Sequence, residues 1–283
     1  MTEYQALPPE ELKLGSFTHL DWRPSPVKRI IYRYEKARPK YLFSTAFLEG
    51  NTYTLPEVHS LLDDQVPEGH NPSETNQILN LNAASVWLVE QIGQGKFQPD
   101  LTTSNKLNYL IAQNEALDAG IPRDKSSVNR NGKGATVSLL GNHLFTGYNK
   151  QQLKDSVPPM LQKIANLNDP VTRALNWAAF ATYAQIYMDG NKRTARYMMD
   201  GILMSHGYDA ISIRTTDRND YNQALHEMYT TGNLAAYASF LAKIGSRSYP
   251  LDSSPLQPEI GELTPESAYS LDENELDNGI DLM

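Results

Sequence analysis

Two apolar segments separated by a short polar loop constrain the fold of this 283-residue chain more than any other feature. Residues 170–186 contain "ALNWAAFATYA" and residues 192–207 contain "YMMDGILM". Both segments are apolar around most of a helical circumference, which suits helices at the centre of a bundle rather than on its surface. We therefore expect one α-helical domain with these two helices as its buried centre.

The segments on either side predict the rest of this domain. Apolar periodicity and helix-end signals predict further helices at 41–50, 55–66, 74–95, 102–120, 153–167 and 217–245. Residues 1–40 contain five prolines and are expected to be irregular. Residues 133–148, "KGATVSLLGNHLFTGY", alternate in polarity around a Gly-Asn turn, which predicts a β-hairpin. The predicted fold class is therefore mainly α with one β-hairpin.

The net charge of −8 comes from the end of the chain. Nine acids and no lysine or arginine follow Arg247, so the rest of the chain holds 25 cations against 24 acids. A nearly neutral body gives no global field that would favour nucleic acid. The acidic, proline-spaced residues 246–283 are expected to be a disordered, solvated tail, with docking of a short piece as the alternative.

Three features predict a cytoplasmic protein. The chain has no cysteine, so it can form neither a disulfide nor a thiolate metal site. Its first residues, "MTEYQALPPEELKLG", are acidic and contain prolines, unlike an apolar signal segment. No apolar run approaches the ~18 residues that a membrane span needs.

The candidate site is the stretch "QIYMDGNKRTAR", residues 185–196. A turn signal at 189–191 opens onto the start of a helix, where unpaired amides and the helix dipole attract anions. Arg193 and Arg196 are three residues apart and would share a face of that helix. Asp189 adds a hard oxygen ligand that suits Mg²⁺ on phosphates. The pattern favours a polyphosphate with Mg²⁺, and an ordinary turn with solvent-facing cations is the alternative.

This stretch resembles the signature loop of the Fic family, whose pattern is His-x-Phe-x-Asp/Glu-Gly-Asn-Gly-Arg-x-x-Arg. The matching positions are Asp189, Gly190, Asn191, Arg193 and Arg196. Tyr187 is a conservative replacement for the phenylalanine, whereas Gln185 and Lys192 depart from the pattern.

Other segments extend the resemblance over roughly residues 41–243. "TAFLEGNTYTLPEV", residues 45–58, is similar to the Ser/Thr-x-x-x-Glu-Gly/Asn inhibitory motif that one Fic class carries upstream of its core. The hairpin at 133–148 falls where the family has its target-docking flap. The segment around Tyr221 falls where its closing helix begins.

The resemblance implies a Fic fold and the transfer of AMP from ATP to a hydroxyl of a target protein. Asp189 would hold Mg²⁺ on the phosphates. The amides of Gly190, Asn191 and Lys192 would line the anion hole that binds the phosphates. Asn191 would also contact the nucleotide. The guanidinium groups of Arg193 and Arg196 would neutralise the β/γ end of ATP. The target protein would dock at the hairpin.

The resemblance further implies that Glu49 inhibits the site by pairing with Arg196. A carboxylate that is bonded to a guanidinium must leave before a phosphate can bind the same nitrogens. Glu49 would therefore exclude the γ-phosphate. The alternative is that Glu49 is only the acid at the end of a helix before Gly50.

Gln185 stands where the family has the histidine that deprotonates the target hydroxyl. An amide can position a hydroxyl but cannot take its proton, and loss of a general base usually costs ~10²–10⁴-fold in rate. We therefore expect weak or no activity, whether the glutamine is natural or introduced. His143, His206 and Tyr183 are the candidate substitutes for the base, with structural or surface roles as the alternative.

Other functions stay open at this stage. Lys192 resembles the corresponding residue of the Doc branch, in which phosphate is transferred in place of AMP. A nucleotide-binding pseudoenzyme whose hairpin recruits a partner is a second alternative, and a purely structural helical domain is a third. The expected organisation is an N-terminal extension (1–40), a Fic-type domain (41–245) with an inhibitory helix near 41–50 and a flap at 133–148, and the tail (246–283).

Overall fold

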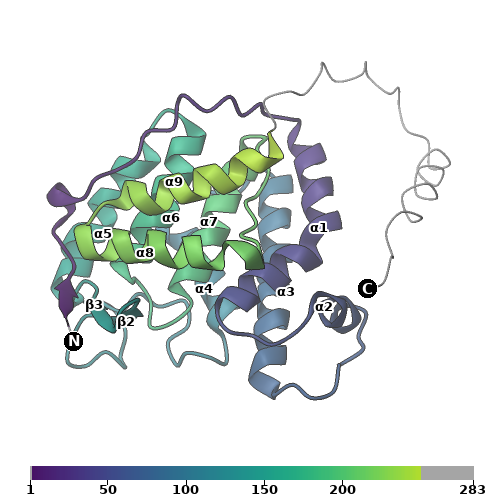
Figure 1. Cartoon of the computed structure of the whole chain (residues 1–283), viewed down its shortest axis with the longest axis horizontal. Helices are drawn as coiled ribbons and strands as arrows, with labels where there is room; N and C mark the ends of the chain where they lie inside the picture. The colour runs from purple at the N-terminus through teal and green to yellow at the C-terminus, as the bar shows by residue number, and fades with distance from the viewer. Residues whose placement is uncertain (1, 250–283) are drawn as a thin grey trace. The chain divides into compact units, whose positions relative to one another are not determined.

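The computed structural model describes residues 2–249, and a pair of central helices organises them (Figure 1). These are α6 (Pro170–Ala184) and α7 (Asn191–Ser205), which pack against each other along their lengths. From Val171 to Ala184 only Arg173 is not buried, and from Asn191 to Met204 only Lys192 is not. The predicted buried centre of the bundle is confirmed.

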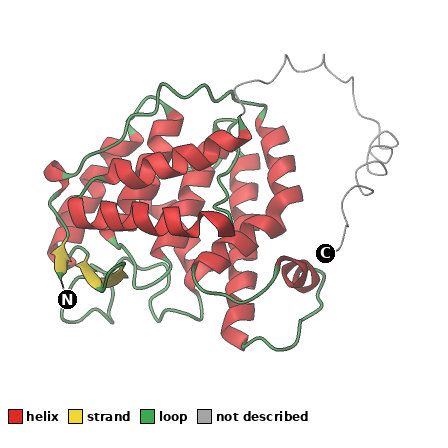
Figure 2. Cartoon of the chain, viewed as in Figure 1, coloured by secondary structure: helices red, strands yellow, loops and turns green. Residues whose placement is uncertain are grey.

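Seven further helices surround this pair among the described residues, so the predicted mainly α fold class is confirmed (Figures 1 and 2). Helices α5 and α9 pack against α6, whereas α1, α3 and α4 pack against α7, and α8 packs against α9. Their bounds are α1 Val27–Leu48, α2 Leu55–Leu62, α3 Pro72–Gly93, α4 Leu101–Ala112, α5 Lys150–Ala165, α8 Arg218–Thr231 and α9 Leu234–Gly245.

The predicted hairpin is present, and a third strand joins it. β2 (Thr136–Leu139) and β3 (His143–Thr146) pair in antiparallel fashion, and Gly141 and Asn142 adopt positive φ angles in the turn between them. β1 (Glu3–Gln5) lies parallel to the other edge of β3. The three residues of β1 are too few to carry a recognisable strand pattern.

Several predicted helix bounds are wrong. The helix expected at 41–50 is the end of α1, which begins at Val27 and contains Pro39, so residues 27–40 are helical rather than irregular. The helix expected to reach residue 120 ends at Ala112, and the helix expected at 217–245 is two helices, α8 and α9. The second break occurs because Gly232 adopts a left-handed conformation (φ 69°), which ends α8.

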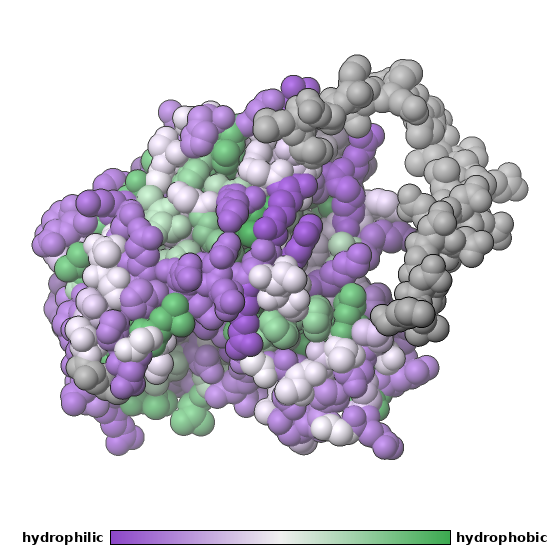
Figure 3. All heavy atoms as spheres, in the orientation of Figure 1, coloured by the Kyte–Doolittle hydropathy of each residue, from purple (hydrophilic) through white to green (hydrophobic). Residues whose placement is uncertain are grey.

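The residues up to Tyr249 form one compact unit, which includes the chain before α1. Phe17 and Trp22 from that segment are buried in the core. Hydrophilic side chains cover most of the face in Figure 3. None of the described helices is both long enough and apolar enough to cross a membrane. The prediction made for the acidic tail concerns residues that lie outside residues 2–249, apart from its first few.

Candidate functional site

The loop between α6 and α7 is closed by the side chain of Asn191. Its Oδ1 accepts a hydrogen bond from the Tyr187 N–H at 2.7 Å, and its Nδ2 donates to the Tyr187 carbonyl at 2.8 Å. Gly190 precedes α7 with φ 73°, a conformation that favours glycine, and a Cβ there would lie 3.1 Å from the Nδ2 of Asn108. The turn is therefore fixed by its own residues before any ligand binds.

Helix α4 supports this loop from beneath through a residue that the sequence did not reveal. Asn108 is fully buried, and its Nδ2 donates to the Asp189 carbonyl at 2.9 Å and to the Thr194 hydroxyl at 3.1 Å. Its Oδ1 accepts from the Gly120 N–H at 2.8 Å, which ties the segment after α4 to the same point. These bonds position the start of α7, where the backbone amides are unpaired.

Asp189 is the exposed acid of the loop. About half of its side chain is exposed (53%), and its Oδ1 lies 2.5 Å from the Gly190 amide nitrogen and 3.4 Å from Nη2 of Arg193. Within residues 2–249, no three acidic or histidine side chains gather as a metal cluster. A single hard carboxylate fits Mg²⁺, which usually binds one or two protein carboxylates and completes its shell with phosphates and water.

Glu49 directly follows α1 and reaches two cations of α7. Its Oε1 lies 3.2 Å from Nη2 of Arg196, and its Oε2 lies 3.0 Å from Nζ of Lys192. Burial raises the pKa of the Glu49 carboxyl, but the charges of Lys192, Arg196 and Arg193 outweigh burial and bring the pKa down to about 2. The carboxylate is therefore charged at neutral pH and bridges the two cations.

Arg196 is buried and held from a second side. Its side chain is 4% exposed, and its Nη1 donates to the Tyr221 hydroxyl at 3.0 Å, from the first turn of α8. Burial alone would lower the pKa of Arg196, but Tyr221 and Glu49 raise it above its usual range. The guanidinium stays charged, and two of its three nitrogens are occupied.

Arg193 has a carboxylate partner that the sequence analysis missed. Glu115 accepts a bidentate pair of bonds from it, with Nη1 to Oε1 at 3.0 Å and Nη2 to Oε2 at 2.7 Å. Glu115 lies in the loop after α4, where a continuous helix was predicted. Burial opposes the charge of Arg193, but the bonds to Glu115 raise its pKa above the usual value. Both arginines of the loop are thus neutralised by carboxylates from other segments.

Gln185 occupies a left-handed position (φ 51°) at the end of α6 and is 7% exposed. Its Nε2 donates to the Thr182 carbonyl at 2.8 Å and to the Tyr229 hydroxyl at 3.0 Å. Its carbonyl accepts from Nε of Arg123, a buried residue of the loop before the hairpin, at 2.6 Å. The side chain is therefore ordered by hydrogen bonds, but it offers no group that titrates near neutral pH.

The candidate substitutes for a base have neighbours of their own, although the buried Nδ1 of His143 has no hydrogen-bond partner among residues 2–249. The Tyr183 hydroxyl accepts from the Leu7 N–H at 2.9 Å. His206 lies at the far end of α7 and bonds the Ile202 carbonyl at 2.7 Å. His143 on β3 stacks on His226 of α8, with ring centroids 5.5 Å apart.

A groove separates the hairpin from α8. It has a volume of about 260 Å³ and is lined by Val137, Ser138, Leu139, Leu140, Lys192, Asn222, Leu225, His226 and Tyr229. Lys192, which binds Glu49, and Tyr229, which binds Gln185, both border this groove. The groove therefore connects the hairpin to the loop that carries the cations.

Curated relatives match most of this chain. A protein adenylyltransferase Fic from Nematostella vectensis is 26% identical over 229 residues, which cover 79% of this chain and 50% of the relative. A protein adenylyltransferase fic-1 from Caenorhabditis elegans is 26% identical over 211 residues, covering 72% of this chain and 39% of the relative. This chain thus spans half or less of the length of these relatives. No family model matches it.

Solved structures match the fold. A Fic domain containing signaling protein from Bacteroides thetaiotaomicron superposes with a TM-score of 0.65 at 18% identity, covering 81% of this chain and 88% of the other. Fic-1 from C. elegans superposes with a TM-score of 0.60 at 21% identity, covering 82% and 66% respectively. The arrangement of helices described above is the arrangement found in these proteins.

Proposed function

Because the chain is a Fic-domain protein, we propose that it is a protein adenylyltransferase, which transfers AMP from ATP to a hydroxyl of a target protein. The observation that carries this proposal is the α6–α7 loop, which places Asp189 beside Arg193 at the start of α7, with Arg196 in the next turn of the same helix. Amides, fixed cations and a metal carboxylate are the groups that polyphosphate binding requires.

The proposed roles follow the geometry of the loop. The backbone amides of residues 190–192 bind phosphate oxygens, which for Gly190 requires its N–H to leave the Asp189 carboxylate. Asn191 and Asn108 hold the loop in position for this. Asp189 holds Mg²⁺, which neutralises charge on the phosphates. Arg196 binds the γ-phosphate after Glu49 has moved away. The hairpin and the groove beside α8 receive the target protein.

Glu49 is the proposed inhibitor. It lies on Arg196 and Lys192 at the distances of ion pairs, so the γ-phosphate and the carboxylate compete for the same guanidinium. In the reaction itself, the target oxygen forms a bond to the α-phosphorus, the bond to pyrophosphate breaks, and pyrophosphate leaves. The hydroxyl proton must pass to a base, and Gln185 accepts none, so water takes it slowly.

A nucleotide-binding pseudoenzyme is the second candidate. The observation in its favour is the hydrogen bonding of Gln185 to Thr182 and Tyr229, which holds an amide in the position of the base. Such a chain would bind ATP and recruit a partner at the hairpin without transferring AMP.

Labelled ATP separates these functions. Three proteins are incubated with ATP labelled at the α or the γ phosphate: the unmodified chain, the Gln185→His variant, and the double variant Gln185→His with Glu49→Gly. The labelled protein is then measured. We expect the double variant to label itself from α-labelled ATP and the unmodified chain to label little. Arg196→Met in the same background is the matched control, because it removes the proposed γ-phosphate ligand.

Each outcome assigns one function. No label together with measurable ATP binding by the double variant supports the pseudoenzyme and contradicts the transferase. Label from the γ position alone supports phosphate transfer with Lys192 setting the orientation of the nucleotide, as in the Doc branch. If the double variant neither becomes labelled nor binds ATP, the result supports a purely structural domain.

A further inference from the structure

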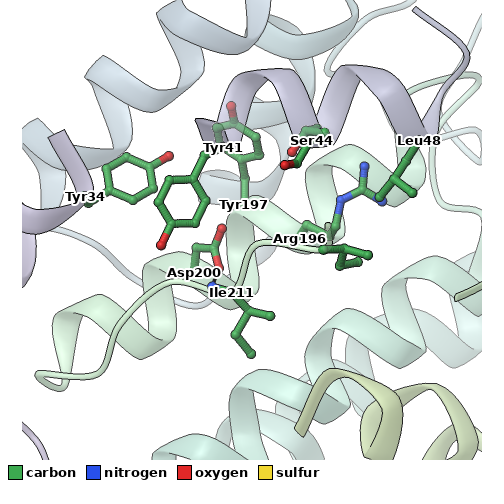
Figure 4. Close-up of a pocket in the computed structure, with 10 residues that line it drawn as sticks. Tyr34, Tyr41, Ser44, Leu48, Arg196, Tyr197, Asp200 and Ile211 are labelled. Atoms are coloured by element: carbon green, nitrogen blue, oxygen red, sulfur yellow. Dashed lines mark hydrogen bonds between the residues drawn. The ribbon is translucent and has the colours of Figure 1, made fainter. Parts of the chain in front are cut away.

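A small enclosed cavity lies behind Arg196, on the seam between α1 and α7 (Figure 4). Its volume of about 10 Å³ matches the space that one water needs. Side chains of α1, α7 and the segment after α7 line it, namely Tyr34, Tyr41, Ser44, Thr45, Leu48, Arg196, Tyr197, Asp200, Ile211 and Ile213. The cavity is therefore enclosed by the helix that ends just before Glu49 and the helix that carries Lys192 and Arg196.

Arg196 presents an unused donor to this region. Its Nη1 binds Tyr221 and its Nη2 binds Glu49, but its buried Nε has no hydrogen-bond partner among residues 2–249. A buried N–H without a partner costs about 1–3 kcal/mol, so such donors are usually satisfied by an ordered water. The side chain is 4% exposed and lines the cavity, which has room for such a water.

Asp200 presents an unused acceptor to the same cavity. It lies one helical turn after Arg196, at the spacing that places two side chains on one face, and both point from α7 towards α1 in Figure 4. It is 6% exposed, and its Oδ1 accepts the Ile211 N–H at 3.0 Å, its one hydrogen bond within the described chain. A charged carboxylate is costly to bury unless it is paired or well hydrogen-bonded.

The tyrosines around Asp200 do not supply that donor. The Tyr41 hydroxyl donates to the Ala210 carbonyl at 3.1 Å, and the Tyr197 hydroxyl donates to the Leu81 carbonyl at 2.8 Å. The Tyr34 hydroxyl lies 3.1 Å from that of Ser85. The nearby Asp209 is paired with Arg33 of α1 at 2.8 Å. Arg196 is therefore the one cation of the cavity lining.

We infer that Asp200 is a positioning residue for Arg196, which it holds from behind through one water in the cavity, so that its protonation sets how strongly Arg196 attracts an anion at its front. With Asp200 charged, Arg196 is partly neutralised even when Glu49 is absent. With Asp200 protonated, the full charge of Arg196 faces Glu49 or a phosphate. The reference to phosphate rests on the proposed function, whereas the link between Asp200 and Arg196 does not.

The titration range of Asp200 makes this coupling relevant near neutral pH. Burial raises the pKa of the Asp200 carboxyl, and the Ile211 N–H and Arg196 lower it in part, so that it lies at about 7. The facing groups from α1 and from the segment after α7 are the tyrosines and the Arg33–Asp209 pair described above. None of them takes the place of the proposed water-mediated link between Asp200 and Arg196.

The direct test uses the whole chain without nucleotide and follows the Nε–H resonance of Arg196 by ¹⁵N NMR between pH 5 and 9. An Arg196→Lys variant assigns the resonance. We expect the resonance to shift with a midpoint near pH 7 and the shift to disappear in Asp200→Asn, which keeps the bond to Ile211 but does not titrate. Asp209→Asn is the matched control, because it makes the same chemical change at a nearby acid that does not line the cavity, and it should keep the titration.

Two results would overturn the inference. One is a resonance that does not titrate in the unmodified chain, and the other is a titration that survives in Asp200→Asn. These outcomes do not depend on AMP transfer, so they are distinguishable from a failure of the proposed function.

A second measurement tests the consequence for anions in the Glu49→Gly background. ATP affinity should be roughly three- to tenfold higher at pH 6 than at pH 8, beyond the change that the same background with Asp200→Asn shows. Subtracting the Asp200→Asn values removes the titration of ATP itself. Equal pH dependence in the two backgrounds would contradict the coupling.

Discussion

Replacement of Glu49 by glycine is the change that tests the proposed inhibition most directly. The carboxylate bridges Arg196 and Lys192 at 3.2 and 3.0 Å, and a γ-phosphate on Arg196 would require both ion pairs to break. Glu49 is the cap residue of α1 rather than part of its hydrogen-bonded interior, and Gly50 already follows it. We therefore expect Glu49→Gly to free the cations without unfolding the helix.

The pKa of Glu49 gives the size of the effect. Its fall from the usual 4.5 to about 2 is the net of burial, which raises it, and of the three cations, which lower it. Since each pKa unit corresponds to about 1.4 kcal/mol, the site favours the charged over the protonated carboxyl by about 3 kcal/mol, and a competing phosphate must replace an interaction of that order, a factor on the order of 100. Lys192 is about one-third exposed (31%) and therefore partly screened by water. We expect ATP with Mg²⁺ to bind about 10- to 100-fold more tightly to Glu49→Gly.

Isothermal titration calorimetry of ATP with Mg²⁺ measures this change. Glu49→Gln should give a similar gain, because it removes the charge and keeps the shape, whereas Glu90→Gln on the exposed face of α3 should give none. An affinity within twofold of the unmodified chain in both Glu49 variants, with unchanged melting temperatures, would refute the competition. Glu49 would then be only the end of α1.

Three further outcomes follow from the site. Glu115→Ala leaves Arg193 buried without its carboxylate, so the unfolding free energy in urea should fall by about 3–5 kcal/mol, and a loss under 1 kcal/mol would contradict this contact. Asn191→Ala removes both hydrogen bonds that close the loop on Tyr187, so the unfolding free energy should fall by about 1–3 kcal/mol and ATP binding should weaken. An unchanged dissociation constant for ATP would count against a preformed loop. The lowered pKa of Glu49 means that its ion pairs stabilise the fold above pH 4.5 and lose this effect as the pH falls towards 2, so urea unfolding of Glu49→Gln should depend less on pH across that range.

The sequence predicted the parts of the fold that local pattern controls. The apolar circumference of α6 and α7 indicated their place at the centre, and the alternation around Gly141 and Asn142 indicated the hairpin. The start of α1 at Val27 was missed because the prolines before residue 40 suggested irregular chain, although Pro26 caps the helix and Pro39 is accommodated within it. β1 was missed because it is a strand only through its pairing with β3.

The contacts that complete the candidate site could not be read from spacing. Glu115 reaches Arg193 across 78 positions of the chain, and Asn108 reaches Asp189 across 81. Both depend on the packing of α4 against α7. The one available signal was "QNEALDAG", in which polar and turn-forming residues weaken the helix where α4 ends. An acid in such a loop is a candidate partner for the two arginines that the sequence placed on one face of the helix at 192–207.

The geometry around residue 185 separates the proposed phosphate site from the proposed position of the base. The backbone there is held by the bond from Arg123 to the Gln185 carbonyl, and the loop beyond it is closed by Asn191, so neither depends on the side chain at 185. The left-handed φ of 51° is a conformation that histidine adopts more readily than most residues other than glycine. A histidine at 185 therefore fits the existing backbone, and it would restore a titratable group while leaving the amides, Asp189 and the arginines in place. The proposed phosphate site and the proposed position of the base are thus structurally independent in this chain, which is why ATP binding and AMP transfer must be measured separately in the same variants.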